Sequence, residues 1–281
     1  MNSFDLYNNS CAACSELITK KYSTSFSLGI RMFDKELRAP IYGIYGFVRF
    51  ADEIVDTFHD FNKKDLLDDF RKETFKAIEQ KISLNPVLHS FQYVVNQYQI
   101  EHQLITDFLD SMEMDLYKTT YESEVLYNKY IYGSAEVVGL MCLQIFTNND
   151  KKFFEELAPY AKSLGAAFQK INFLRDMNSD LEERGRVYFP GIDLSKFDEF
   201  TKQEILKDIQ IDFDKSLEGI RLLPKGARRG VYLAYKYYLH LYKNIRSASI
   251  EKILAERIRV SDGRKAYLLM NTVVKNTFNL V

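Results

Sequence analysis

The sequence predicts an all-α protein that folds as a single large helical bundle. Three observations predict this class. The 281 residues include only 12 glycines and 5 prolines, about half the usual share of ~12%. Apolar residues recur at three- and four-residue spacing along most of the chain, as on helices that bury one face. No comparably long segment alternates apolar and polar residues, which a half-buried strand would do.

The helical periodicity falls into successive stretches separated by short breaks. Their approximate ranges are 11–30, 38–58, 65–82, 86–117, 123–147, 150–184, 200–222, 226–247 and 250–278. The breaks contain turn-forming residues, for example Asn85-Pro86, Gly185 and Pro190-Gly191. No linker is long or biased enough to divide the chain, so we expect one domain over residues 1–281.

Composition excludes several classes of protein. With 46% hydrophobic and 27% charged residues, the chain is neither intrinsically disordered nor collagen-like. The segment MNSFDLYNNS lacks the basic and apolar regions of a signal peptide, and no stretch approaches the ~18 consecutive apolar residues of a membrane span. Three cysteines form no disulfide framework. We therefore expect a cytoplasmic protein.

The net charge of −1 hides an asymmetry along the chain. Residues 1–220 carry an excess of 11 acidic groups, and residues 221–281 an excess of 10 basic groups. The two parts could neutralise each other within the fold, or the basic part could face an anionic ligand. The basic part contains no recognisable nucleic-acid-binding module, so no nucleic-acid partner is expected.

The stretch 41–58 is apolar nearly all round, as central helices are, yet it carries Asp52 and Asp56. Four residues apart, these carboxylates share one helix face, together with Arg49. Burying two like charges is costly unless a cation neutralises them. A divalent metal ion is the obvious candidate.

A second set of oxygen-bearing side chains lies on the stretch 150–184. Gln169, Asn172, Asp176 and Asp180 share a single helix face by their spacing, and Arg175 lies beside Asp176. Their oxygens are the kind of ligand that Mg²⁺ prefers, and the bound ion would keep positions for water and substrate phosphate. Two such faces across a bundle suit a diphosphate leaving group. The alternative is two exposed acidic faces neutralised by a basic tail.

The sequence resembles the squalene/phytoene synthases, which join two isoprenoid diphosphates head to head, and among them the bacterial phytoene synthases of carotenoid pathways. The resemblance covers most of the chain. It is carried by YSTSFSLGI at 22–30, RAPIYGIYGFVRFADEIVD at 38–56, SMEMDL at 111–116, YIYGSAEVVGLM at 130–141, GAAFQKINFLRDMNSDLEERGRVYFP at 165–190, and a C-terminal segment containing Arg257.

The resemblance implies an isoprenoid-synthase bundle around a central hydrophobic cavity, and it assigns roles to individual residues. Mg²⁺, with Mn²⁺ as an alternative, would be bound by Asp52, Asp56, Asn172, Asp176 and Asp180. The diphosphates and the first substrate would be bound by Ser25, Phe26, Arg49, Gln169, Asn172, Arg175 and Arg257. Tyr130 and Tyr238 match aromatic residues beside the reacting carbons; without the resemblance, both would be interpreted as ordinary core packing. The catalytic set is then Asp52, Asp56, Asp176, Asp180, Tyr130 and Tyr238.

The implied activity is the condensation of two geranylgeranyl diphosphates to phytoene through a cyclopropyl diphosphate, without a redox cofactor. Two alternatives stay open: a squalene or dehydrosqualene synthase that uses farnesyl diphosphate, and a non-catalytic assembly or scaffold relative. Because the product is so apolar, we expect peripheral contact with the inner face of the membrane. Other carotenoid-pathway enzymes are candidate partners.

Three positions depart from the common family pattern. Tyr22 stands where many members have histidine, and Asn178-Ser179 replaces Gly-Glu before Asp180. Glu136 replaces a glycine in a stretch that lines the cavity in the family. The first two departures leave every expected metal ligand in place, whereas Glu136 would put a carboxylate into an apolar wall.

Overall fold

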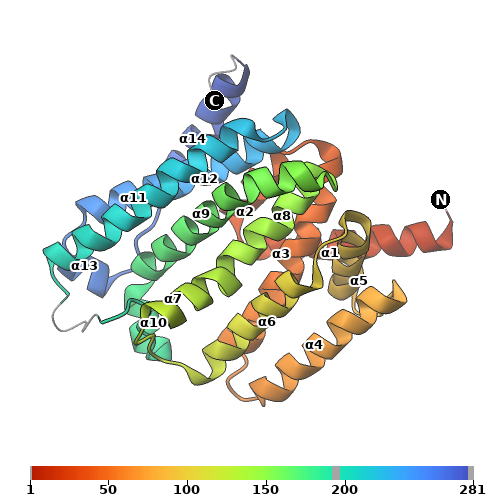
Figure 1. Cartoon of the computed structure of the whole chain (residues 1–281), viewed down its shortest axis with the longest axis horizontal. Coiled ribbons are helices and arrows are strands. Elements are labelled where there is room, and N and C mark those ends of the chain that lie inside the picture. The colour runs from red at the N-terminus through yellow and green to blue at the C-terminus, as the bar shows by residue number, and fades with distance from the viewer. Residues whose placement is uncertain (1, 192–196, 278–281) are drawn as a thin grey trace.

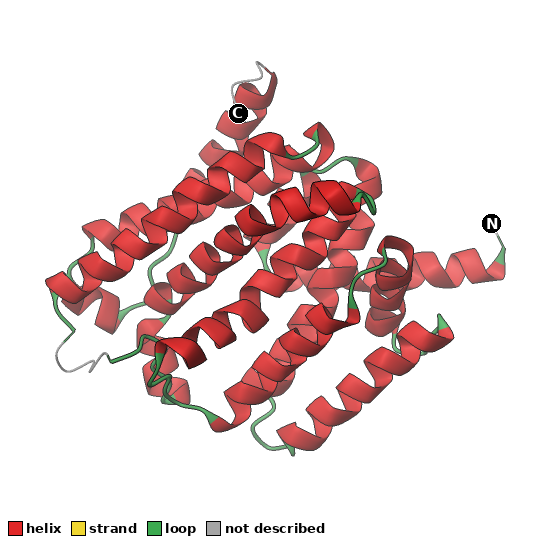
Figure 2. Ribbon diagram, in the orientation of Figure 1, coloured by secondary structure: helices red, strands yellow, loops and turns green. Residues whose placement is uncertain are grey.

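The expected all-α class is confirmed. The computed structural model describes residues 2–191 and 197–277, and these form a bundle of packed helices (Figure 1) joined by short loops (Figure 2). In chain order the helices are α1 Ser3–Tyr22, α2 Thr24–Arg31, α3 Lys35–Asp56, α4 Lys63–Gln80, α5 Pro86–Tyr98, α6 His102–Tyr117, α7 Glu124–Ile131, the π-helix η1 Tyr132–Glu136, α8 Val137–Thr147, α9 Lys151–Arg175, α10 Met177–Arg184, α11 Glu199–Leu222, α12 Lys225–Ser247, α13 Ile250–Ala255 and α14 Asp262–Thr277.

Several periodic stretches are broken where the sequence predicted one helix. In the stretch 11–30, Ser23 adopts an extended conformation, and its side chain caps α2 by accepting from the Phe26 N–H. In the stretch 86–117, Gln99 takes a left-handed conformation that ends α5. The stretches 150–184 and 250–278 also divide, at Asp176 and at residues 256–261. The apolar spacing continues across these breaks, so periodicity alone does not locate them.

The stretch 123–147 is continuous but contains the π-helix η1 in its middle. Helices pack very closely around it. A Cβ on Gly133 would lie 2.6 Å from the carbonyl oxygen of Asp107, and one on Gly165 would lie 2.8 Å from that of Ala135. The two glycines therefore let α6 and α9 approach η1 from opposite sides.

Helix α9 lies at the centre of the bundle, between α8 and α11 (Figure 1). Buried hydrophobic residues form two clusters. One is centred on Phe47, Phe91 and Phe108 of α3, α5 and α6. The other includes Ile171 of α9 and Phe213 of α11, with residues from α7 and α12. The main cavity is lined by residues of both clusters.

By length and hydropathy, the segment Glu124–Thr147 could cross a membrane, although it contains no run of 18 apolar residues. Its mean hydropathy reaches 1.2 over the most apolar window, half of which is buried inside the bundle. Close packing of η1 and α8 against α6 and α9 accounts for its apolar character.

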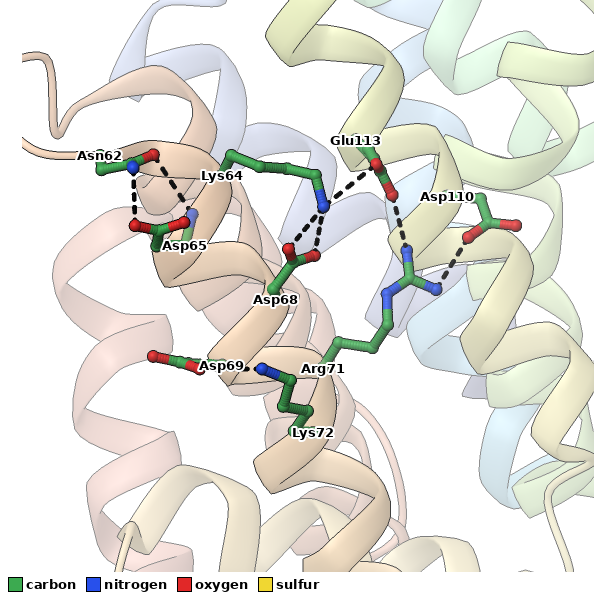
Figure 3. A network of polar contacts seen from close by, with 9 residues as sticks. All are labelled: Asn62, Lys64, Asp65, Asp68, Asp69, Arg71, Lys72, Asp110 and Glu113. Atoms are coloured by element: carbon green, nitrogen blue, oxygen red, sulfur yellow. Dashed lines mark hydrogen bonds and ion pairs between the residues drawn. The ribbon is translucent and has the colours of Figure 1, made fainter.

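On the outside of the bundle, an ion-pair network joins α4 to α6 (Figure 3). Arg71 of α4 lies 2.8 Å from Asp110 and 3.4 Å from Glu113 of α6. Lys64 lies 2.5 Å from Asp68 and 3.3 Å from Glu113. These side chains are 23–48% exposed, so solvent screens their charges and each pair adds little to stability.

Candidate active site

A cavity of about 910 Å³ opens into the bundle. Every site residue expected from the sequence lines it: Ser25, Phe26, Arg49, Asp52, Asp56, Tyr130, Gln169, Asn172, Arg175, Asp176, Asp180, Tyr238 and Arg257. Helices α2, α3, α7, α9, α10 and α12 contribute these residues, along with the segment after α13. The fold thus brings together residues that lie more than 200 positions apart in the sequence.

The first pair of carboxylates lies on the last turns of α3. Asp52 is 3.9 Å from the guanidinium of Arg49, which also pairs with Glu53. The same guanidinium lies over the ring of Tyr22, 4.4 Å from its centroid. Cation–π contact with Tyr22 thus helps to hold Arg49 at the cavity wall.

Asp56 meets a residue that the sequence analysis did not identify, Arg186. The Arg186 Nη1 atom lies 3.1 Å from Asp56 Oδ1. Arg186 is buried and follows the left-handed Gly185 that ends α10. Its neighbour Val187 forms an isolated parallel bridge with Thr120, which ties this segment to the loop after α6. Arg186 thus brings a buried cation from the segment after α10 to Asp56 of the first carboxylate pair.

A second residue that the sequence analysis missed is Asp115, on the last turn of α6. Its side chain is only 5% exposed. It accepts hydrogen bonds from Tyr130 at 2.9 Å and Tyr121 at 3.3 Å, and lies 3.8 Å from Arg186 Nη1. Burial raises the pKa of Asp115 to about 7, although Arg186 opposes the shift. Asp115 lies within SMEMDL, one of the segments that carry the family resemblance, but no second acidic residue at helical spacing marks it as a site residue.

The second set of side chains is arranged differently from the prediction. Asp176 does not lie within one continuous helix; it ends α9 and begins α10, with φ −104° and ψ 9°. Backbone hydrogen bonds from Asp176 N–H to Asn172 O and from Asp180 N–H to Asp176 O bridge the break. The four oxygen-bearing residues therefore still face the cavity.

Two arginines hold Asp176. Arg175 donates from Nε to Oδ1 at 2.9 Å and from Nη2 to Oδ2 at 2.5 Å. Arg257, from the basic C-terminal part, places its Nε 2.8 Å from Oδ1. Part of the charge asymmetry in the sequence is therefore neutralised at this site, and two fixed guanidinium groups lie where an anionic ligand would meet them.

Aromatic rings form much of the remaining wall. Tyr238 donates to Asn172 Oδ1 at 3.1 Å, and its ring stacks on Phe168 at 3.8 Å between centroids. Tyr130 stacks with Tyr188 at 5.5 Å, and Phe173 lies against Tyr188 at 4.0 Å. Burial raises the pKa of both Tyr130 and Tyr238, so both phenols stay protonated at neutral pH.

Ser25 and Phe26 of α2 line the cavity, and the Phe26 ring packs against an aromatic ring of α3. The Phe26 ring is 5.7 Å from that of Tyr45, and it is 36% exposed. Deeper in the cavity the lining turns apolar, with Ile30, Phe33, Val138, Leu157 and Leu223. The cavity thus has a charged end and a hydrophobic end.

The sequence matches the profile of the squalene/phytoene synthase family over residues 19–264. The chain belongs to this family. The squalene/phytoene synthases are head-to-head prenyltransferases, so this member is an enzyme that transfers prenyl groups.

Similar proteins include both a diapophytoene synthase and a phytoene synthase by name. The chain is 26% identical to a 4,4'-diapophytoene synthase of Staphylococcus haemolyticus, over 90% of this chain and 93% of that one. It is 28% identical to a 15-cis-phytoene synthase of Synechocystis, over 89% and 78%. A crystal structure of a dehydrosqualene synthase matches with a TM-score of 0.83 at 23% identity, covering 97% and 98%; this last match bears on the fold.

The departures from the squalene/phytoene synthase pattern are accommodated locally. Asn178 donates from its side chain to the Leu254 carbonyl at 2.8 Å, and Ser179 donates to the Asp176 carbonyl at 3.0 Å. Glu136 does not belong to the lining of the main cavity. It lies in a second pocket between η1, α9 and α11, lined also by Lys162, Asp212 and Lys215. The apolar wall of the main cavity therefore remains free of this carboxylate.

The donors that could hold a divalent metal are oxygen atoms throughout. In residues 2–191 and 197–277, no group of three His, Cys, Asp or Glu side chains converges as a preformed metal site. The carboxylates instead contact arginines, at Asp56 and Asp176 above all. Carboxylate and amide oxygens around an open cavity fit Mg²⁺, which keeps several waters and is shared with substrate phosphates.

Proposed function

We propose that this squalene/phytoene synthase condenses two molecules of geranylgeranyl diphosphate to phytoene and releases two diphosphates. One observation carries the proposal. Two sets of oxygen-bearing side chains, on α3 and on α9–α10, line the charged end of a cavity of about 910 Å³ whose inner walls are apolar. This volume is near the upper end of the ~300–1,000 Å³ of ligand pockets and favours the longer prenyl chain.

Divalent metal would be held by Asp52 and Asp56 on one side, and by Asn172, Asp176 and Asp180 on the other. Mg²⁺, with Mn²⁺ as an alternative, supplies charge neutralisation to the leaving diphosphate. Arg49, Arg175 and Arg257 present fixed guanidinium groups at the same end of the cavity, where they stabilise the charge that develops as the carbon–oxygen bond breaks. Gln169 adds an amide to the diphosphate pocket.

The aromatic wall protects the allylic cation that ionisation leaves behind. The rings of Tyr130 and Tyr238 are buried and line the cavity, and ring faces attract a desolvated cation by about 2 kcal/mol. The same rings exclude water, which would otherwise capture the cation. Ser25 and Phe26 on α2 contribute to binding of the first substrate.

The reaction has two stages. The first prenyl cation adds to the double bond of the second substrate, and loss of a proton closes a cyclopropyl diphosphate. The second ionisation releases the other diphosphate, the cyclopropyl cation rearranges, and loss of a carbon-bound proton forms the central double bond. Released diphosphate accepts the proton lost in each stage, and no redox cofactor takes part.

Mass spectrometry of the hydrocarbon made from C15 and C20 substrates offered together tests the proposal. We expect a C40 product that requires Mg²⁺ and is lost with EDTA. A C30 product alone would contradict the substrate assignment and favour a dehydrosqualene synthase, and NADPH-dependent product would favour a squalene synthase. The diapophytoene synthase among the similar proteins makes this the relevant alternative.

We further propose a cytoplasmic enzyme with peripheral contact at the inner face of the membrane. Phytoene is too apolar to leave into water, and residues 221–281 carry an excess of 10 basic groups that anionic lipid would attract. Other carotenoid-pathway enzymes would then receive the product at the membrane. Flotation with anionic and neutral vesicles tests this location, and equal partitioning to both would count against the charge contribution.

A further inference from the structure

Arg186 lies between two carboxylates, Asp56 on α3 and Asp115 on α6. We propose that Asp115 is a positioning residue that shares Arg186 with Asp56 and so keeps Asp56 available to a divalent metal. The proposal rests on the proposed function, because it takes Asp56 to be a metal ligand. It assigns a role to two residues that belong to neither of the two predicted sets.

The geometry shows how Arg186 is held. Its Nη2 atom donates to the backbone carbonyl of Asp115 at 2.8 Å, and its Nη1 atom is 3.8 Å from the Asp115 carboxylate. The same Nη1 atom is 3.1 Å from Asp56 Oδ1. Asp115 thus contacts Arg186 through both main chain and side chain, while Asp56 contacts it through one oxygen.

Surrounding hydrogen bonds fix the Asp115 carboxylate in this orientation. Tyr130 donates to Oδ2 and Tyr121 to Oδ1, so both oxygens have partners besides Arg186. The Asp115 and Arg186 side chains are 5% and 8% exposed, whereas that of Asp56 is 28% exposed. Asp56, the proposed metal ligand, is therefore the more solvent-exposed of the two carboxylates, and Asp115 is the buried one.

The positive charge of Arg186 opposes metal binding at Asp56. A guanidinium beside Asp56 repels a divalent cation and competes with it for the carboxylate. The Asp115 carboxylate offsets that repulsion, and it would remain an ion-pair partner for Arg186 when a metal ion binds Asp56. Without the Asp115 charge, Asp56 would be the only one of these two carboxylates left to pair with Arg186, and metal would have to displace a buried cation.

The test is the Mg²⁺ concentration that gives half-maximal binding of inorganic diphosphate, measured by calorimetry on the full chain at about pH 8, above the pKa of about 7 that burial gives Asp115. Asp115→Asn keeps the shape of the side chain and removes its charge, so it should raise this concentration by about tenfold. Arg186→Gln should need no more Mg²⁺ than wild type. The double variant Asp115→Asn/Arg186→Gln should return close to the wild-type value, because the competing cation is gone.

The double variant separates positioning from simple structural damage, since damage at two contacting sites would not restore binding. Asp110→Asn, on the same helix but in the exposed network, is the matched control and should bind as wild type does. An unchanged Mg²⁺ requirement in Asp115→Asn, or a raised one in Arg186→Gln, would overturn the proposal. Should Asp115→Asn fail to fold, the Arg186→Gln result alone still decides. Wild-type protein that binds no diphosphate at any Mg²⁺ concentration would instead contradict the proposed function.

Discussion

Helix α6 carries exposed and buried carboxylates that behave differently although they lie within five residues of one another. Asp110 and Glu113 point toward α4 and pair with Arg71 and Lys64 on the surface (Figure 3). Asp115 points into the bundle, where it meets Arg186 and two tyrosines. Solvent screens the first group, while burial makes the second depend on its partners. The role of an acidic residue here follows from its surroundings and not from its position in an acidic stretch.

The largest expected difference between cavity and surface carboxylates is in turnover, and it is tested by substituting the carboxylates that line the cavity. Asp52→Asn and Asp176→Asn should each lower turnover by at least about a hundredfold, because charge neutralisation at the leaving diphosphate is lost. Product formation from labelled substrate measures the effect, and circular dichroism should show intact helices. Asp110→Asn serves as the surface control with unchanged turnover. Retained activity in either cavity variant would contradict the metal-site assignment.

Alanine substitutions compare how much the buried and the exposed carboxylates of α6 contribute to stability. Asp115→Ala leaves the buried Arg186 and two tyrosine hydroxyls without their partner, and should lower the free energy of unfolding by about 3–5 kcal/mol. Asp110→Ala, which breaks an exposed pair, should lower it by less than about 1 kcal/mol. Urea titration followed by circular dichroism measures both. Equal losses would show that burial does not distinguish the two groups.

The pH dependence of stability gives a smaller effect with a definite sign. The pKa of Asp115 is about 7 in the folded protein and near its ordinary value of 3.8 when unfolded. Between these values the folded state holds a proton that the unfolded state has lost, so stability falls as pH rises from about 4 to about 7. Without added metal, wild type should lose stability relative to Asp115→Asn across this window. A constant difference between the two melting temperatures would count against the raised pKa.

The smallest expected effect is that of salt on the exposed network. Raising ionic strength from about 0.01 M to about 1 M shortens the screening length from roughly 30 Å to 3 Å. The stability difference between wild type and Lys64→Met should then shrink from at most about 1 kcal/mol toward zero. For Asp115→Ala the difference should persist at high salt, since solvent ions do not reach a side chain that is 5% exposed.

Much of the site could be predicted because its residues repeat at helical spacing. Asp52 and Asp56, and Asn172, Asp176 and Asp180, are each four residues apart. The resemblance to a family added the isolated residues such as Ser25 and Arg257. All of them line one cavity; their chemical roles, and the single-domain boundary of 1–281, stay predictions.

The other features of the site could not be predicted, because they depend on tertiary contacts that leave no local pattern in the sequence. Asp115 and Arg186 are far apart in sequence, and neither repeats at a helical interval. The helix break at Asp176 and the π-helix Tyr132–Glu136 interrupt no apolar spacing. Glu136 ends the π-helix and lies in a second pocket; the wider π-helical turn changes which residues share a helix face, and a periodicity of 3.6 does not anticipate it.

The sequence separations of these contacts have a kinetic consequence. Arg186 is 71 residues from Asp115 and 130 from Asp56, whereas the helices that carry them form through local contacts. Closing such long loops costs entropy before any contact forms, so this arrangement should assemble late in folding. Substitutions at Arg186 would then accelerate unfolding more than they slow folding. Substitution of the buried arginine should therefore shorten the lifetime of the native state and leave the speed of reaching it nearly unchanged.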